Sequence, residues 1–217
     1  MIKHTLGLAL LALAFGAQAQ ATLGSNLIVN GDAESGVAGW TGFEGYSMFQ
    51  SVDYGNNWVL PTQPGPLDRG SKMFTGLTAQ AAGFQALDLG ALAGQSLHYE
   101  LSGYLGGWAA QGDNALLYVS FLDAQDNEIG HAVIGPVTPA DRNNQTGLFL
   151  RTASGQLPAN TSSLMFSLSM ERLGGGDNDG YADNLSFVVS SVPEGSTLAY
   201  ALAGIGLLGG LLGRRRR

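Results

Sequence analysis

Three acidic side chains beside glycine-rich turns could bind a divalent cation. Asp32 and Glu34 follow Gly31 near the start of the chain, and Asp183 follows Gly180 near its end. Calcium takes six to eight oxygen ligands at about 2.3–2.6 Å, from carboxylates, backbone carbonyls and water. Asp32, Glu34 and Asp183 are therefore candidate calcium ligands. The alternative is that Asp32 and Asp183 only cap turns, as aspartate often does.

A second acidic run, Asp177-Asn178-Asp179-Gly180, lies shortly before Asp183. Alternating aspartates followed by glycine match part of a calcium loop, but the full EF-hand pattern requires glutamate where this chain has Val188. A hairpin turn explains the run better. An ion bound here would share Asp183 with the first group.

Aromatic side chains stand beside short polar ones at two places, which is the chemistry that sugar binding needs. Sugars stack their C–H faces on aromatic rings, and their hydroxyl groups need hydrogen-bond partners. The first group runs from Trp108 to Asn114, and the second combines Trp58 with Tyr54 and Asn57. Our candidate ligand-binding residues are Trp108, Gln111, Asp113, Asn114 and Trp58. The alternative is ordinary packing of aromatic residues at the end of a β-sandwich.

No motif indicates catalysis. The chain has no Gly-x-Ser-x-Gly nucleophile elbow and no phosphate-binding loop. His98 and His131, the two histidines after the first twenty residues, have no recognisable nucleophile partner. Carboxylates are numerous, but a glycosidase needs two of them facing one bond, and no pattern here pairs them. We therefore expect no enzyme activity.

The acidic composition narrows the range of partners. Between residues 20 and 191 the chain has five Lys or Arg residues against sixteen Asp or Glu residues, a formal charge of −11. Such a surface repels nucleic acid and anionic lipid, so we expect no nucleic-acid partner and favour divalent cations and neutral sugars. The chain has no cysteine, which excludes thiol chemistry, iron–sulfur clusters and cysteine zinc sites.

Alternating hydrophobic residues predict an all-β domain. Apolar residues recur at every second position, the period of half-buried strands, in Leu97–Leu105, Leu117–Phe121, Leu164–Met170 and Leu185–Val189. Shorter strands are expected at Asn26–Asn30 and Trp58–Leu60. The 33 glycines supply the many tight turns of an all-β fold. We predict a single β-sandwich domain over residues 20–191.

The first nineteen residues have the three parts of a secretory signal peptide. Lys3 and His4 form a polar start, Leu6–Phe15 is apolar, and Ala17-Gln18-Ala19 offers a small-x-small cleavage site, with Ala19-Gln20-Ala21 as a second choice. The apolar stretch is short and ends in a cleavage pattern, so it is not a transmembrane helix. We therefore predict that the chain is exported.

The last 26 residues combine a polar motif, an apolar segment and a cationic end. Leu198–Gly213 is uncharged, and as a helix its sixteen residues would span roughly 24 Å, somewhat less than a hydrocarbon core of about 30 Å. We predict a single transmembrane helix over 198–213. Its cytoplasmic stop is Arg214, Arg215, Arg216 and Arg217. Everything before residue 192 then lies outside the inner membrane.

This tail resembles the PEP-CTERM sorting signal of Gram-negative bacteria, which is Val-Pro-Glu-Pro-Ser-Thr followed by an apolar helix and an arginine cluster. The matching residues are Val192, Pro193, Glu194, Ser196 and Thr197, and Gly195 replaces the second proline. The resemblance implies recognition and cleavage by an exosortase, a membrane-embedded enzyme. It implies an inner-membrane-anchored precursor that is then released or transferred to the cell surface, as part of an exopolysaccharide or biofilm system.

The two ends of the predicted domain resemble galactose-binding-like jelly-roll modules, which include many bacterial carbohydrate-binding modules. Asn30–Glu34 is similar to their opening strand, and Gly180–Phe187 is similar to their last strand. The resemblance implies a jelly-roll β-sandwich whose first and last strands lie close together, tied by a structural calcium. The acidic positions of the family fall on Glu34 and Asp183, with Asp32 as an additional ligand.

We therefore expect an exported β-sandwich that binds polysaccharide without modifying it. Binding would use aromatic stacking and polar contacts at one end of the sandwich, and calcium would stabilise the fold. The expected partners are an exosortase, the inner membrane before processing, and a polysaccharide. A structural surface protein without a sugar site is the first alternative, and a surface hydrolase is the second.

Overall fold

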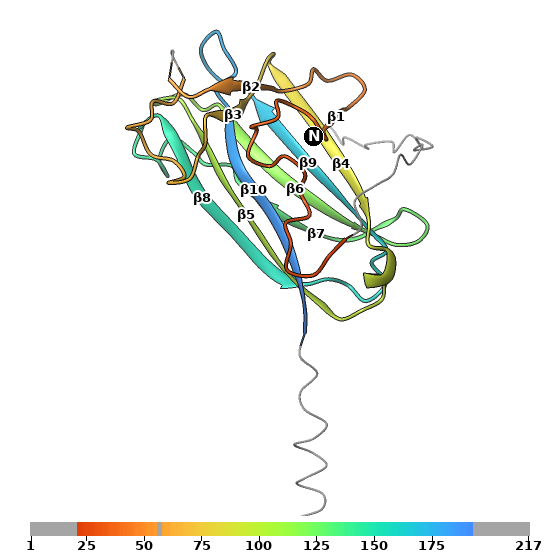
Figure 1. Cartoon of the computed structure of the whole chain (residues 1–217). Coiled ribbons are helices and arrows are strands. Elements are labelled where there is room, and N and C mark those ends of the chain that lie inside the picture. The colour runs from red at the N-terminus through yellow and green to blue at the C-terminus, as the bar shows by residue number, and fades with distance from the viewer. Residues whose placement is uncertain (1–20, 56–57, 193–217) are drawn as a thin grey trace, which may run out of the picture.

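The computed structural model describes residues 21–55 and 58–192, which form β-strands and one short 3-10 helix (Figure 1). The elements are β1 (Thr41–Gly42), β2 (Gln50–Asp53), β3 (Lys72–Thr75), β4 (Gln80–Asp88), η1 (Gly90–Leu92), β5 (Leu97–Gly107), β6 (Asn114–Leu122), β7 (Glu128–Ile134), β8 (Gly147–Gln156), β9 (Ser163–Glu171) and β10 (Tyr181–Ser191).

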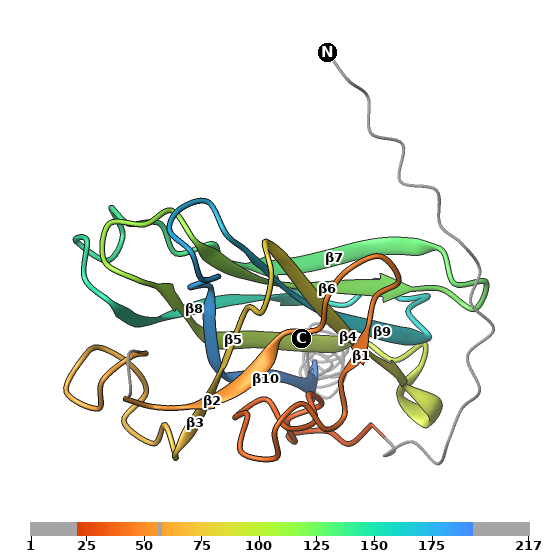
Figure 2. The same cartoon turned by 90° about the horizontal axis from the view of Figure 1, so that it is seen from above.

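These strands build two antiparallel sheets that lie face to face (Figures 1 and 2). One sheet has the order β1-β4-β9-β6-β7 and the other the order β2-β3-β10-β5-β8. We name them the β9 sheet and the β10 sheet after their central strands. Most connections cross from one sheet to the other, which is a jelly-roll-like arrangement. The all-β sandwich expected from the alternating pattern is confirmed.

Inward-facing residues at alternate positions of the long strands build the core. On β9, Leu164, Phe166 and Leu168 are buried, while the residues between them remain partly exposed. From the opposite sheet, the ring of Phe187 meets that of Phe166 edge-on at 5.4 Å. Each fully buried side chain of this kind contributes about 1.5–3 kcal/mol to folding. The core therefore fixes which residues of each strand face outward.

The N-terminal segment does not form the strand predicted over Asn26–Asn30. Only Asn26 makes a β-bridge, with Val188 of β10. The Asn26 side chain accepts the backbone N–H of Phe187 at 2.9 Å, so a side chain replaces part of the expected backbone ladder. Asn30 has a φ of 50°, in the left-handed region, which ends an extended run.

Strand prediction also differs from the structure near the edges of the β10 sheet. Trp58–Leu60 is not a strand, because hydrogen bonds between Gly55 and Val59, and between Trp58 and Gly55, close a turn instead. β8 has no counterpart among the predicted strands. Its inward positions carry Phe149, Arg151 and Ala153. Because Arg151 interrupts the apolar residues, the sequence shows no continuous apolar period over this strand.

The targeting segments lie outside the described residues. These are the predicted signal peptide over 1–19, the sorting motif after Val192, the transmembrane helix over 198–213 and the arginines at 214–217. Val192 itself is described, and its backbone N–H donates to the Ser96 carbonyl at 3.1 Å. Within residues 21–55 and 58–192, no helix is long and apolar enough to cross a membrane.

Candidate functional site

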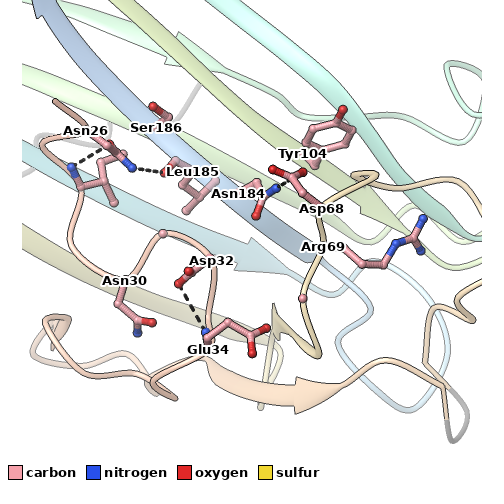
Figure 3. A pocket seen from close by; sticks show the side chains of 13 residues that line it. Asn26, Asn30, Asp32, Glu34, Asp68, Arg69, Tyr104, Asn184, Leu185 and Ser186 are labelled. Carbon is pink, nitrogen blue, oxygen red and sulfur yellow. Dashed lines mark hydrogen bonds between the residues drawn. The ribbon is translucent and has the colours of Figure 1, made fainter. Parts of the chain in front are cut away.

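A polar cavity opens beside β10, where the start of the described chain meets its last strand (Figure 3). The cavity has a volume of about 680 Å³ and lies next to a bulge in β10 between Asp183 and Ser186. Its polar side chains come from Asn26, Asn30, Asp32, Glu34, Asp68, Arg69, Tyr104, Asn184 and Ser186. The structure thus places Asp32 and Glu34 at one site beside the final strand.

Asp183 adjoins this cavity and has no exposed surface. Its carboxylate accepts the Tyr54 hydroxyl at 2.5 Å and the backbone N–H of Asn184 at 2.7 Å. Burial raises the pKa of Asp183 to about 7, and the negative charges of Asp32 and Glu34 act in the same direction. The three candidate calcium ligands therefore influence one another electrostatically, although they come from opposite ends of the domain.

The Glu34 carboxylate holds the chain that leads into β3. It accepts the backbone N–H groups of Ser71 and Lys72 and the Ser71 hydroxyl, each at 2.7 Å. Slight burial opposes ionisation, but these bonds outweigh it and keep the pKa of Glu34 below its usual value. Gly70 has a φ of +62°, and a β-carbon there would lie 2.4 Å from Glu34 Oε1. The left-handed φ and the close approach of the Glu34 carboxylate both favour glycine at this position.

The other two acids of the cavity, Asp32 and Asp68 (Figure 3), have exposed side chains. Asp32 accepts the backbone N–H of Glu34 at 3.4 Å, and Asp68 accepts the side-chain amide of Asn184 at 2.9 Å. Across residues 21–55 and 58–192, no three acidic, histidine or cysteine side chains form a ready metal-binding group.

The donor chemistry of the cavity nevertheless fits a hard cation such as calcium. A carboxylate offers about four lone-pair positions, and protein donors fill three on Glu34 and two on Asp183. A buried carboxylate beside two others leaves a local excess of negative charge that a cation would neutralise.

Trp58 and Trp108, the two candidate stacking residues, pack around one small satellite core. Its buried members are Val59, Met73, Leu148 and Tyr181. Both tryptophans contact this cluster and stay half-buried, and the Trp58 ring meets the Tyr181 ring edge-on at 6.3 Å. The structure brings the two predicted aromatic groups together, in the packing arrangement that was the alternative to sugar binding.

The polar residues predicted beside Trp108 have different surroundings. Asp113 is fully buried, and its carboxylate accepts three backbone N–H groups of the loop 173–179, at 2.7 to 2.9 Å. Gln111 and Asn114 are half-buried, and the Asn114 amide donates to a nearby backbone carbonyl at 3.3 Å. Gln111 and Asn114 therefore reach the surface. Asp113 does not, and its carboxylate is occupied by the loop 173–179.

The acidic run Asp177–Gly180 connects β9 to β10. These strands belong to different sheets, so the run is a crossover loop and the predicted hairpin turn is wrong. Asn178 is buried, and its amide donates to the Thr78 carbonyl at 2.6 Å. Asp179 accepts the Tyr181 hydroxyl at 2.6 Å. These two side chains are used to hold the loop in place.

The outer face of the β9 sheet carries an aromatic pair that no sequence motif marks. Phe84 of β4 and Tyr118 of β6 each pair directly with Ser167 of β9, so the three side chains share one face. Because neighbouring strands are about 4.8 Å apart, the two aromatic residues are roughly 10 Å apart. The half-exposed ring of Phe43 packs on Phe84 at 4.8 Å, and Phe84 itself is buried. We call Phe43, Phe84, Ser167 and Tyr118 the Phe84–Tyr118 row.

A polar cluster adjoins this row on β6 and β7. The hydroxyls of Tyr118 and Ser120 donate to the Glu128 carboxylate at 2.6 and 2.8 Å, and His131 Nδ1 lies 3.2 Å from Glu128 Oε1. The rings of Tyr118 and His131 stack at 4.9 Å. Burial, together with Glu128, raises the pKa of Tyr118 to about 12. The Tyr118 hydroxyl therefore stays protonated at neutral pH and acts as a donor.

No protein-family model and no curated protein matches this chain. Among solved structures, the chain is similar to the enzymatically active domain of tailspike protein 4 of bacteriophage CBA120. The TM-score is 0.50 and the identity 14%, over 76% of this chain and 21% of that one. It is also similar to Family 16 Carbohydrate Binding Module-2, with a TM-score of 0.49 and 25% identity over 75% of this chain and 99% of the module.

A third similar structure is the CBM22-1 xylan-binding domain of a Paenibacillus barcinonensis protein. Its TM-score is 0.45 and its identity 17%, over 80% of this chain and 99% of that domain. At these identities the comparisons show the fold alone, a jelly-roll-like β-sandwich. The case for a function therefore depends on the side chains of this chain.

Proposed function

We propose that this protein is an exported, noncatalytic module that binds polysaccharide at a cell surface or in an extracellular matrix. The Phe84–Tyr118 row is the observation that carries the proposal. The exposed part of the row consists of the ring of Tyr118 and the ring of Phe43, which covers buried Phe84, on the outer face of one sheet, with Ser167 between Phe84 and Tyr118. Sugar rings of one chain can stack on Tyr118 and Phe43 while the serine bonds to a sugar hydroxyl.

A binding role without catalysis fits the carboxylates near this row. A glycosidase uses two carboxyl groups that flank one bond, at roughly 5–10 Å from each other. Beside Tyr118 stands one carboxylate, Glu128, and both of its oxygens already bond to protein hydroxyls. The row is therefore suited to hold a sugar chain.

Affinity electrophoresis of the full-length protein tests this function. In gels that contain a neutral polysaccharide, such as a glucan, mannan or xylan, the protein should migrate more slowly than in a gel without polysaccharide. Unchanged migration in every gel would favour the structural surface protein without a sugar site.

Calcium at the polar cavity is the second part of the proposal, with Asp32, Glu34 and Asp183 as its ligands. Support comes from the raised pKa of buried Asp183 beside two other carboxylates. Bound calcium would supply positive charge that offsets this repulsion. The ion would then tie the N-terminal segment to the last strand and so stabilise the domain.

Removing calcium should therefore lower the melting temperature. A ligand present at a hundred times its dissociation constant adds about 2.7 kcal/mol of stability, which corresponds to roughly 5–10 °C for a domain of this size. Thermal unfolding with excess calcium and with excess EDTA, at constant ionic strength, measures the difference. Identical melting curves would remove Asp32, Glu34 and Asp183 as calcium ligands.

The sorting tail completes the proposal. An exosortase would process the chain at the motif that begins with Val192, after the helix over 198–213 has anchored the precursor in the inner membrane. In the structure β10 ends at Ser191, so the motif begins directly after the last strand of the domain. The protein would then act in an exopolysaccharide or biofilm system.

A chain that lacks Val192–Arg217 should accumulate as a soluble periplasmic protein, because both anchor and sorting motif are absent. Cell fractionation followed by immunodetection compares this truncation with the full-length protein. Surface display that persists in the truncated chain would contradict the sorting role.

A further inference from the structure

The Phe84–Tyr118 row lies on a sheet without strongly basic side chains. The strands β1, β4, β9, β6 and β7 contain no lysine and no arginine. Their acidic residues are Asp88, Glu128 and Glu171. Arg172 follows β9, but it donates to the carbonyl of Gly176 in the next loop. An anionic sugar chain on this face would therefore meet no opposite charge from Lys or Arg of these five strands.

Glu128 is the carboxylate that adjoins the aromatic row. Its side chain is 39% exposed, so a ligand that stacks on Tyr118 can reach it. Burial alone would raise the pKa of Glu128, but the bonds from Tyr118 and Ser120 and the nearby His131 outweigh it and lower the pKa. Glu128 therefore remains ionised at mildly acidic pH, where the amines of sugars are protonated.

We propose that the row selects polysaccharides that carry free amino groups, and that Glu128 is the residue that recognises the ammonium group. This inference rests on the proposed polysaccharide-binding function and names the class of ligand. A sugar ring stacks on Tyr118, and its ammonium group donates from the solvent side to Glu128 Oε2, which has one protein partner among the described residues, the Ser120 hydroxyl. Charge-assisted bonds of this kind are about twice as strong as neutral ones.

The charge of the domain supports the same class of ligand. Residues 20–191 carry a formal charge of −11, which attracts a cationic polymer over about a Debye length and repels polymers of uronic acids. The ring of Tyr118 adds a π-face next to which a cation is favourable. The net charge of the domain attracts the cationic polysaccharide at long range. Glu128 beside the ring of Tyr118 selects the sugar unit whose amino group can reach it.

Three hexasaccharides that share one β-1,4-linked glucose-type backbone and differ only at carbon 2 provide the test. They carry a hydroxyl, an acetamide or an ammonium group, and calorimetry with the full-length protein at mildly acidic pH measures their affinities. The glucosamine hexamer should bind at least roughly tenfold more tightly than the other two, the value of one charge-assisted bond. Raising the salt from about 50 to 500 mM should reduce this preference.

Two matched variants separate recognition by Glu128 from overall charge. Glu128→Gln keeps the shape and an acceptor for Tyr118 but removes the charge, and the ratio of the affinities should fall to about one. Glu171→Gln removes the same charge from the far end of the same sheet, roughly 27 Å away along β6, since Glu171 pairs with Asn114 and Glu128 with Leu122. This variant should keep the preference for the glucosamine hexamer.

The possible failures are distinguishable. If the parent protein binds the hydroxyl form as tightly as the ammonium form, amine selection is wrong while polysaccharide binding stands. If Glu128→Gln and Glu171→Gln weaken the preference equally, net charge causes it and the assignment to Glu128 is wrong. If none of the three hexamers nor any neutral polysaccharide binds, both the inference and the proposed function fail.

Discussion

Tyr118→Ala should abolish retention of the protein by polysaccharide in affinity electrophoresis. The substitution removes one of the two aromatic residues that flank Ser167, and aromatic anchors of binding sites typically contribute 2 kcal/mol or more. We expect affinity to fall by roughly thirtyfold. Stability should change little, because Tyr118 is only half-buried on the outer face and lies outside the core.

Two further variants show which property of Tyr118 matters and where the site is. Tyr118→Phe keeps the ring and loses only the bond to Glu128, so it should retain binding to neutral polysaccharide. Trp108→Ala tests the competing site at the end of the sandwich, and it should lower stability because Trp108 packs on the satellite core. Loss of retention in Trp108→Ala but not in Tyr118→Ala would place the sugar site at Trp108, as the sequence predicted.

Asp183→Asn should remove one pH-dependent contribution to the stability of the calcium-free protein. Burial and the nearby carboxylates raise the pKa of Asp183 to about 7 in the folded state, whereas aspartate in an unfolded chain titrates near 3.9. The folded protein thus keeps a proton that the unfolded chain releases. The stability due to this proton is present below about pH 4 and is lost as pH rises to about 7.

The free energies of unfolding of the two proteins should therefore diverge with pH. Asp183→Asn removes the buried charge while its side-chain oxygen still accepts the Tyr54 hydroxyl. Between about pH 4 and 7 the free energy of unfolding of Asp183→Asn should rise relative to that of the parent by on the order of 4 kcal/mol. Urea unfolding at several pH values, with EDTA present, measures this difference.

Asp68→Asn is the matched control, since it removes an exposed carboxylate from the same cavity and should not reproduce the divergence. Excess calcium should stabilise the parent above pH 7 and leave Asp183→Asn nearly unaffected, if Asp183 is a ligand. If the free energies of unfolding of the parent and of Asp183→Asn change in parallel between about pH 4 and 7, Asp183 is ionised in the folded protein over this range and its pKa is not raised.

The sandwich itself could be predicted because strand alternation is a local property. Leu164, Phe166 and Leu168 alternate with polar residues, and this period decides which side of β9 is buried in any sandwich. The same reasoning failed at Asn26–Asn30, where side-chain bonds to the backbone and a left-handed φ replace strand pairing. β8 was beyond such reasoning, since an edge strand needs only a partly apolar inner face.

The candidate sites depended on contacts between distant segments. Alternation shows that Ser167 and Tyr118 face outward, but only the register of β6 and β4 against β9 makes Tyr118 and Phe84 its direct neighbours. Asp183 resembled other turn aspartates in the sequence, and its burial beside Tyr54 gives it a distinct charge state. Asp113 resembled a surface ligand, and the loop 173–179 covers it.

The amino-acid order by itself thus determined an all-β chain with an acidic middle, and it predicts targeting signals at both ends. Tertiary structure decided which side chains meet, which carboxylates lose contact with water, and which aromatic residues remain on a surface. The physical reason is that periodicity and net charge are set by neighbours along the chain. Register and burial are set by packing of all the strands at once, so small differences in distant segments decide them.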